Sequence, residues 1–328
     1  MIHRLLLLVI LLWVWMLAGC ASGPFAHKSR VIARDDAFVI VQMGQESTRS
    51  LAKRFLGSED EYWMIEDANR AEDLAPVRQV VIPLKGFNPT GITQDGYQTV
   101  PILCYHRFGE RGGKLEVSAS QFREQMQYLK SNGYRVIPLA DLLGFLQGEK
   151  PIPKRSVVLT IDDGHRSIYK VAFPILEEFQ FPATIFLYTD YMDKGGLTTR
   201  ELRSMKRSGL ISIQAHSKTH ANLTLRDADE SKQHYLRRVD SEVEVPIDAI
   251  RQKLGAKPHF YAYPFGATNK QVIDILKDHG VLMGLTVESQ SNAAFTYPYT
   301  LHRSMIYGDR GMDAFVDRLA TFQPRDRK

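Results

Sequence analysis

The chain has 328 residues, of which 44% are hydrophobic and 24% charged, and its formal net charge is +5. This composition excludes a disordered or collagen-like polypeptide and suits one barrel-sized domain together with a smaller one. The mild positive charge fits an ordinary solvated surface. No phosphate-binding glycine loop, Gly-x-Ser-x-Gly elbow or nucleic-acid motif is present, so no nucleic-acid partner is expected. The sequence leads us to infer no protein partner.

Residues 1–19 are predicted to be a removable signal. A basic start at 1–4 precedes an apolar run at 5–17 that is too short to span a membrane comfortably. The Leu-Ala-Gly-Cys sequence that ends at Cys20 resembles a bacterial lipobox. The resemblance implies a lipid anchor on Cys20 in the cell envelope and, because Ala21 is not aspartate, an outer-membrane location facing the periplasm. A plain secretory signal or an uncleaved anchor is the alternative.

Residues 20–36 have a mixed, largely polar composition. They are expected to form a tether that links the lipid anchor to a small folded unit at 37–84. Within this unit the pattern predicts a strand at 38–41, helices at 46–55 and 60–69, and a strand at 80–83. This order resembles a LysM domain, an α+β module that binds N-acetylglucosamine polymers. The usual Gly-Asp-Thr turn and Pro-Gly pair are missing, so a spacer role is the alternative to sugar binding. A glycine-containing linker is predicted at 85–99.

Strands and helices alternate in the remaining domain, residues 100–328. Strands are predicted at 100–106, 135–137, 157–161, 183–187, 211–214, 259–264 and 281–285, and helices at 118–132, 139–146, 167–179, 199–208, 245–254 and 269–279. Such alternation predicts an α/β fold with a parallel sheet, either open or closed. Cys104, in the first strand, is expected to be a small buried core residue.

Residues that can bind a metal ion follow two of these strands, aspartates after one and histidines after the other. Asp162, Asp163 and a glycine come after the strand at 157–161, and His216 and His220 after the strand at 211–214. An Asp-Gly pair is also ordinary turn chemistry, and two histidines four residues apart are often incidental. Together, however, two imidazoles and one carboxylate provide three ligands and leave a fourth position for water, as in a catalytic zinc site.

Three ordered motifs are similar to those of the polysaccharide deacetylases, the NodB-homology domains of carbohydrate esterase family 4. Residues 160–164 (Thr-Ile-Asp-Asp-Gly) match Thr-Phe-Asp-Asp-Gly, residues 216–220 (His-Ser-Lys-Thr-His) match His-Ser/Thr-x-x-His, and residues 261–266 (Tyr-Ala-Tyr-Pro-Phe-Gly) match Ala-Tyr-Pro-Tyr-Gly. The resemblance covers roughly 100–307. It implies a distorted (β/α)-barrel of about seven strands, preceded by the LysM-like domain.

The resemblance also implies an activity, metal-dependent N-deacetylation of an N-acetylglucosamine-containing glycan polymer. Asp163, His216 and His220 would hold a divalent metal, with zinc expected, which polarises the acetamide carbonyl and lowers the pKa of its water. Asp162 would be the general base that takes the proton from that water. The backbone N–H of Phe265 would help to hold the oxyanion.

Several positions depart from the family's patterns or stay open. Ala262 stands where many members have an arginine that orients the base, so the residue that orients Asp162 is not identified. Tyr263 and Phe265 are predicted to line the sugar groove, and plain core aromatics are the alternative.

The general acid has two candidates. Residues 299–304 are similar to the Leu-Pro-Arg form of a subgroup, which makes His302 one candidate, and His106 at the end of the first strand is the other. The third alternative is that neither histidine is the general acid.

The expected polymers are poly-β-1,6-N-acetylglucosamine, an exopolysaccharide, and peptidoglycan. The Ala-Tyr-Pro motif favours the first and the LysM-like segment the second. Two other hypotheses remain: an inactive glycan-binding envelope lipoprotein, and an O-acetyl esterase that uses the same site.

Overall fold

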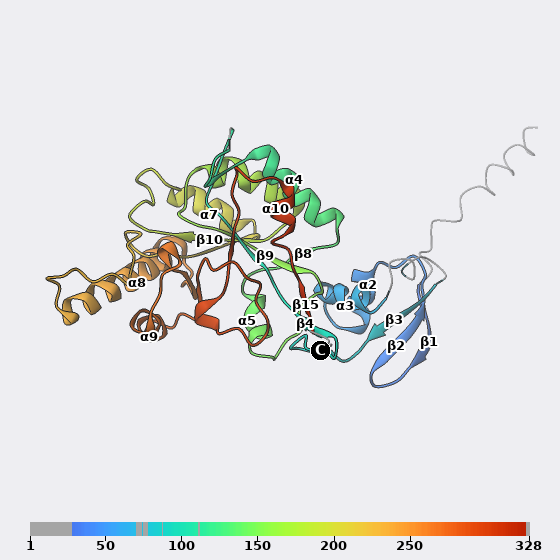
Figure 1. Ribbon diagram of the computed structural model, residues 1–328. Helices are drawn as coiled ribbons and strands as arrows, with labels where there is room; N and C mark the ends of the chain where they lie inside the picture. Colours follow the sequence, from blue (N-terminus) through green and yellow to red (C-terminus); the bar gives the residue numbers. More distant parts are fainter. Residues whose placement is uncertain (1–27, 70–73, 75–77, 87, 111, 326–328) are drawn as a thin grey trace, which may run out of the picture. The chain divides into compact units, whose positions relative to one another are not determined.

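The computed structural model describes residues 28–69, 74, 78–86, 88–110 and 112–325 (Figure 1). The chain divides into two compact units, residues 1–87 and 88–328. The predicted signal, Cys20 and the first part of the predicted tether lie outside the described residues. Among the residues that are described, none belongs to a helix long and apolar enough to cross a membrane.

The smaller unit is a three-stranded antiparallel sheet that packs on two helices. Its elements are β1 (Arg30–Arg34), β2 (Phe38–Gln42), α2 (Thr48–Phe55), the short η1 (Glu59–Glu61), α3 (Tyr62–Ala68) and β3 (Gln79–Pro83). Ser47 begins α2 by accepting a hydrogen bond from the Ser50 amide. The end of the predicted tether differs, because Arg30 and Val31 and, after a register shift, Ala33 and Arg34 pair with β2 and form strand β1.

The larger unit is organised around a parallel sheet of order β13-β12-β11-β10-β9-β5-β14, with β8 also paired to β9. The strands are β5 (Ile102–Tyr105), β8 (Arg135–Val136), β9 (Ser156–Ile161), β10 (Ala183–Leu187), β11 (Ile211–Ala215), β12 (Phe260–Ala262), β13 (Met283–Leu285) and β14 (Ser304–Met305). The seven strands of this path curl into a half-barrel. The predicted α/β barrel of about seven strands is therefore confirmed.

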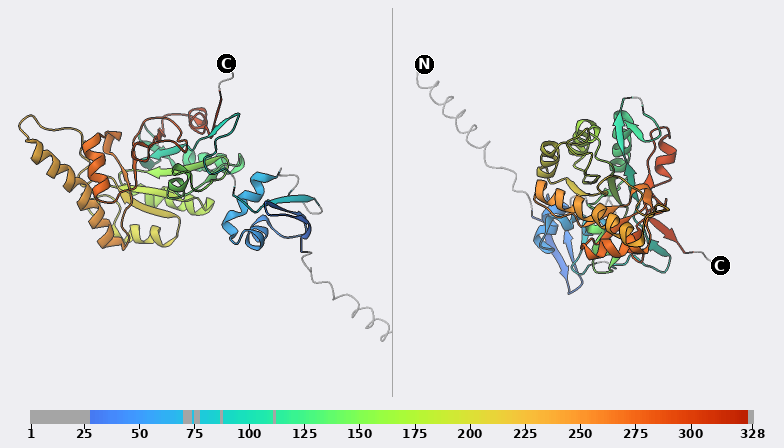
Figure 2. Two further views of the ribbon diagram at one scale, coloured as in Figure 1. Left: turned by 90° about the horizontal axis from the view of Figure 1, so that it is seen from below. Right: turned by 90° about the vertical axis from the view of Figure 1, so that its left-hand side faces the viewer.

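Helices cover the outer side of this sheet (Figure 1). They are α4 (Ala119–Ser131), α6 (Phe173–Phe179), α7 (Thr199–Arg207), α8 (Lys232–Leu254), α9 (Lys270–Asp278) and the short α10 (Met312–Val316). Helix α5 (Asp141–Leu146) instead packs against the inner residues of the strands. Capping boxes at Ser118 and Thr198 begin α4 and α7. Helix α8 packs on α9 (Figure 2). It begins 13 residues before the predicted start at 245, because Ser231 is its N-cap. Pro246 therefore lies inside the helix and not near its start.

The two faces of the strands bury different cores. Alternate residues such as Leu103 and Leu159 pack against the outer helices, whereas Ile102 and Val158 point into the half-barrel and meet Phe186 there. Because all the strands are parallel, their carboxyl ends meet at one edge of the sheet. That edge is where the loops that carry the predicted site residues begin.

The predicted linker at 85–99 also differs from the structure. Residues 88–99 belong to the larger unit, where β4 (Gly96–Gln98) pairs antiparallel with β15 (Phe322–Pro324). Gly96 has φ +152°, and a Cβ there would lie 2.1 Å from the Gln323 carbonyl oxygen. Only glycine permits this approach, so the glycine belongs to a strand pair and not to a free linker.

Candidate functional site

One carboxylate and two imidazoles meet at the carboxyl edge of the sheet. Oδ1 of Asp163, in the loop after β9, lies 3.7 Å from Nε2 of His216 and 3.3 Å from Nε2 of His220, which both follow β11. The three ligand atoms all lie within 4.8 Å of one another. The structure thus brings together the three residues predicted to hold a metal.

The donor atoms of this cluster fit a divalent cation. Nδ1 of His216 lies 2.7 Å from the Ala262 carbonyl oxygen, a contact that places its proton on Nδ1 and leaves Nε2 free as a ligand. Burial lowers the pKa of His216, which favours the neutral imidazole that metals bind. Oδ1 of Asp163 is buried and has no hydrogen-bond partner among the described residues. A cation would compensate this buried charge.

Backbone strain concentrates around the same cluster. Asp163, Ser217, His220 and Phe265 have φ between +59° and +72°, the left-handed region that non-glycine residues rarely adopt. Each such residue costs on the order of 1–3 kcal/mol and persists only where the surrounding structure holds it. The loops therefore place these side chains at a cost in stability, as functional sites commonly do.

Asp162, the predicted base, is held by a buried arginine. Nη1 and Nη2 of Arg303 donate to Oδ1 and Oδ2 of Asp162, both at 2.7 Å; the Arg303 side chain is 0% exposed and that of Asp162 is 2% exposed. Nε of Arg303 donates to the Thr286 carbonyl oxygen at 2.8 Å. Oδ2 of Asp162 also lies 3.9 Å from Nε2 of His216, so the carboxylate borders the metal cluster.

The arginine decides the charge of this carboxylate. Burial alone would raise the pKa of Asp162, but the charge of Arg303, its hydrogen bonds and the nearby His216 together hold that pKa well below its ordinary range. Asp162 is therefore ionised at neutral pH. Sequence reasoning missed this role of Arg303, although the residue stands in the segment likened to the Leu-Pro-Arg form.

Comparison with known proteins agrees with this geometry. Residues 149–284 match the family model described as polysaccharide deacetylase. Poly-β-1,6-N-acetyl-D-glucosamine N-deacetylase of Escherichia coli K12 is 27% identical over 246 residues, 64% of this chain and 36% of that protein. The enzyme of the same name from Staphylococcus aureus MRSA252 is 25% identical over 216 residues, 64% and 74% of the two chains. The larger unit of this chain is thus similar to polysaccharide deacetylases.

Solved structures show the same fold for the deacetylase domain. The Streptococcus pyogenes deacetylase PplD, in complex with acetate, has a TM-score of 0.61 at 23% identity and covers 68% of this chain and 98% of its own. IcaB from Ammonifex degensii has a TM-score of 0.61 at 22% identity and covers 70% and 100%. The chain spans only about a third of the length of the Escherichia coli relative.

The two candidates for the general acid lie in different places in the deacetylase domain. A ring nitrogen of His106, Sγ of Cys104 and a carboxylate oxygen of Asp162 all lie within 4.8 Å of one another, and Nδ1 of His106 is buried without a hydrogen-bond partner among the described residues. The buried state predicted for Cys104 is confirmed. His106 therefore lies beside the predicted base.

His302, in contrast, is not brought to the site. Its ring lines a cavity of about 500 Å³ together with Tyr97 and Thr99, which precede β5, and lies 3.6 Å from Glu288. Adjacent side chains of an extended chain point to opposite sides. Because Arg303 points into the half-barrel, His302 points away from it, into this separate cavity. Its predicted role as the general acid is corrected on this ground.

The two predicted groove residues also separate. Tyr263 is fully buried in the core, where its hydroxyl donates to the Tyr299 carbonyl oxygen, so it does not line a groove. Phe265 is 63% exposed, and its ring lies 4.8 Å from that of His220. The ring of His220 also lies 5.3 Å from that of Tyr188, which is stacked on Tyr191.

Sequence reasoning did not single out these two tyrosines. Tyr188, Tyr191, His220 and Phe265 together form an aromatic rim at the metal cluster.

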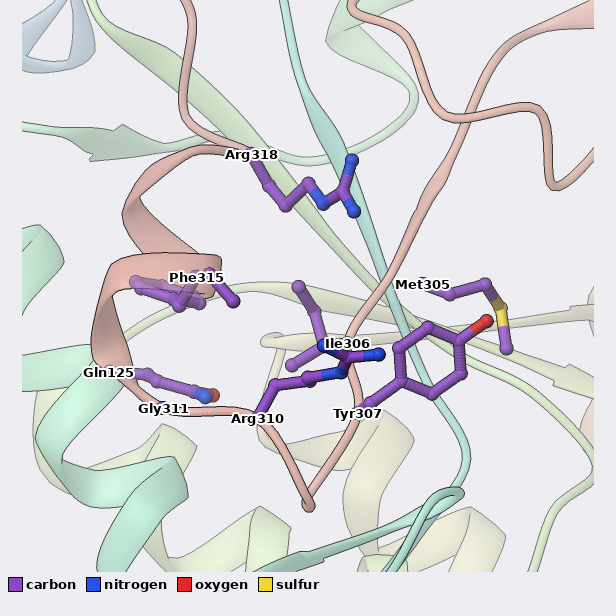
Figure 3. A pocket seen from close by; sticks show the side chains of 9 residues that line it. Gln125, Met305, Ile306, Tyr307, Arg310, Gly311, Phe315 and Arg318 are labelled. Atoms are coloured by element: carbon purple, nitrogen blue, oxygen red, sulfur yellow. The ribbon is translucent and has the colours of Figure 1, made fainter.

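A second hollow is unrelated to the cluster. A cavity of about 190 Å³ lies between α4 and α10 (Figure 3), and Gln125, Tyr307, Arg310 and Phe315 contribute to its lining. None of its lining residues belongs to the metal cluster, to the aromatic rim or to the Asp162–Arg303 pair.

Proposed function

We propose that the domain is a metal-dependent hydrolase that removes acetyl groups from the N-acetylglucosamine units of a glycan polymer. The observation that carries the proposal is the convergence of Asp163, His216 and His220 beside an ionised carboxylate, Asp162, that a buried arginine orients. Poly-β-1,6-N-acetylglucosamine is the preferred polymer, because both curated relatives described above are named for it.

The roles follow from the geometry. Asp163, His216 and His220 would hold the cation, which supplies Lewis acidity next to the acetamide carbonyl. Asp162 accepts a proton from the attacking water while Arg303 keeps the carboxylate in place. The water oxygen bonds to the acetyl carbon, the C–N bond breaks, and acetate and a free amine leave.

Two further residues complete the proposed reaction. His106, whose ring lies beside Asp162, donates the proton that the leaving amine nitrogen takes up. The backbone N–H of Phe265 stabilises the oxyanion.

The aromatic rim provides a surface for the sugar. The rings of Tyr188 and Phe265 both lie next to His220, so a pyranose ring whose acetamide reaches the cluster would rest on them. Aromatic rings bury large apolar areas while the polar groups of a ligand stay wet, which suits the carbon–hydrogen face of a sugar.

Acetate release from purified polymers tests the proposal. Wild type is expected to release acetate from the β-1,6-linked polymer faster than from peptidoglycan. Asp162→Asn should retain metal and lose about 10²–10⁴-fold in turnover, the usual contribution of a general base. Asp163→Asn should lose metal as well, and Asp309→Asn, an exposed aspartate, is the control for charge removal.

Three outcomes would contradict this scheme. Metal loss in Asp162→Asn would show that the neighbouring carboxylates have exchanged roles. Acetate release from O-acetylated polymers alone would favour an esterase. Metal binding without any acetate release would favour an inactive glycan-binding protein.

The cell location is a separate proposal. We infer from the lipobox-like sequence that Cys20 carries a lipid and that the chain is anchored in the cell envelope, at the outer membrane facing the periplasm. Cys20→Ser should abolish incorporation of labelled palmitate and release the protein from the membrane fraction. Unchanged fractionation of Cys20→Ser would contradict the anchor.

The smaller unit is proposed to bind glycan as a LysM-like module. The full chain should then bind insoluble peptidoglycan, and soluble N-acetylglucosamine oligomers should compete. A spacer role predicts that deletion of residues 37–84 leaves this binding unchanged.

A further inference from the structure

Helix α8 carries a buried carboxylate that contacts the loop between the two metal-binding histidines. Glu242 is 6% exposed and lies between Val239 and Val243 on the buried face of the helix, where the pattern calls for an apolar residue. A charged group in such a position is costly unless it is hydrogen-bonded. The partners of this carboxylate therefore show what it does.

All the hydrogen bonds to this carboxylate come from the histidine loop. The backbone N–H groups of Lys218 and Thr219 both donate to Oε2 of Glu242 at 2.9 Å, and the Thr219 hydroxyl donates to Oε1 at 2.7 Å. Ser217 and His220, on either side of these two residues, have left-handed backbones. The carboxylate thus holds the middle of a strained turn whose ends carry His216 and His220.

The main-chain carbonyl group of Glu242 also lacks its usual hydrogen bond within the helix. Pro246 has no N–H and cannot donate to the carbonyl oxygen of Glu242 four residues earlier. The Tyr261 hydroxyl, from β12, donates to this carbonyl oxygen instead, at 3.3 Å. Glu242 is therefore fixed at its main chain by the sheet and at its side chain by the histidine loop.

We propose that Glu242 is a positioning residue for the metal ligands His216 and His220. It touches neither the metal cluster nor the base, and acts by preorganising the turn between the histidines. The inference rests on the proposed function, because it requires the metal site. Groups that orient metal ligands typically contribute 10–100-fold to metal affinity.

The experiment measures zinc affinity of the full chain by competition with a chromophoric chelator, together with the urea midpoint of the metal-free protein. Glu242→Met, close in size and helix propensity, leaves both loop amides without an acceptor and should weaken zinc binding about 10–100-fold. Glu242→Gln can still accept from the amides and should stay within a few-fold of wild type. Glu244→Met, exposed on the same helix, is the matched control and should bind as wild type does.

A second variant covers the possibility that Glu242→Met does not fold. Thr219→Val removes only the hydroxyl partner and should weaken zinc binding a few-fold with an unchanged urea midpoint. Zinc affinity in folded Glu242→Met or Thr219→Val equal to that of wild type would overturn the inference while leaving the proposed function standing. Failure of wild type itself to bind zinc would overturn both.

Discussion

The buried pair of Asp162 and Arg303 allows a quantitative prediction. Arg303→Met removes the guanidinium but leaves the carboxylate 2% exposed and without its two 2.7 Å hydrogen bonds. Removing one partner of a buried ion pair typically costs about 3–5 kcal/mol, because the remaining charge stays desolvated. For a domain of this size that corresponds to a fall of about 6–20 °C in the melting temperature.

The assay compares urea unfolding of metal-free protein for wild type, Arg303→Met, Asp162→Asn and the double variant. The double variant carries no buried charge at this place, so it should be more stable than Arg303→Met alone, with a coupling of about 0.5–3 kcal/mol. Arg310→Met, at a side chain that is 70% exposed, is the matched control and should change stability by less than about 0.5 kcal/mol.

Two results would refute the reasoning. Equal stability of Arg303→Met and wild type would mean that the carboxylate finds another partner or takes up a proton without cost. Additive effects in the double variant would mean that the two side chains act independently.

Three further predictions follow from the site and its surroundings. Tyr188→Ala should raise KM for the polymer about tenfold, the effect of losing about 1.4 kcal/mol of contact, and leave zinc content unchanged. An equal effect in Phe295→Ala, at an exposed ring that lines the cavity beside His302, would contradict a role for the aromatic rim. A chelator should abolish acetate release without loss of the circular dichroism signal, and zinc should restore it; activity that persists in metal-free protein would refute the metal site. Burial of Asp193 opposes its ionisation, but hydrogen bonds from Lys253 and Thr199 lower its pKa to about 2, so its contribution to stability is complete above about pH 4 and is lost as the pH falls toward 2. The stability difference between wild type and Asp193→Asn should therefore shrink between pH 5.5 and pH 3, and a constant difference would contradict the lowered pKa.

Local signals in the sequence were sufficient for the metal cluster. Asp163, His216 and His220 each follow a buried strand within a few residues, and parallel strands bring their carboxyl ends to one edge. The strand and helix alternation predicted the half-barrel for the same reason. Both predictions depend only on the order of short segments along the chain.

Contacts between distant segments could not be predicted in the same way. Arg303 reaches Asp162 across 141 residues, and Glu242 reaches the histidine loop through the packing of α8 on the sheet. A local pattern does not reveal which distant group either residue contacts. His302 and Tyr263 were misplaced because a short motif does not reveal which side of an extended chain faces the site.

The pairing of β4 with β15 has a practical consequence. It joins residues 96–98 to residues 322–324, so β4 and β15, from the two ends of the described part of the larger unit, lie side by side. The entry lies just before β5 and hence at the rim opposite the histidines. Reporter or affinity sequences fused after residue 325 would therefore leave glycan access clear, and a short peptide joining these ends would permit circular permutation with new termini in a surface loop.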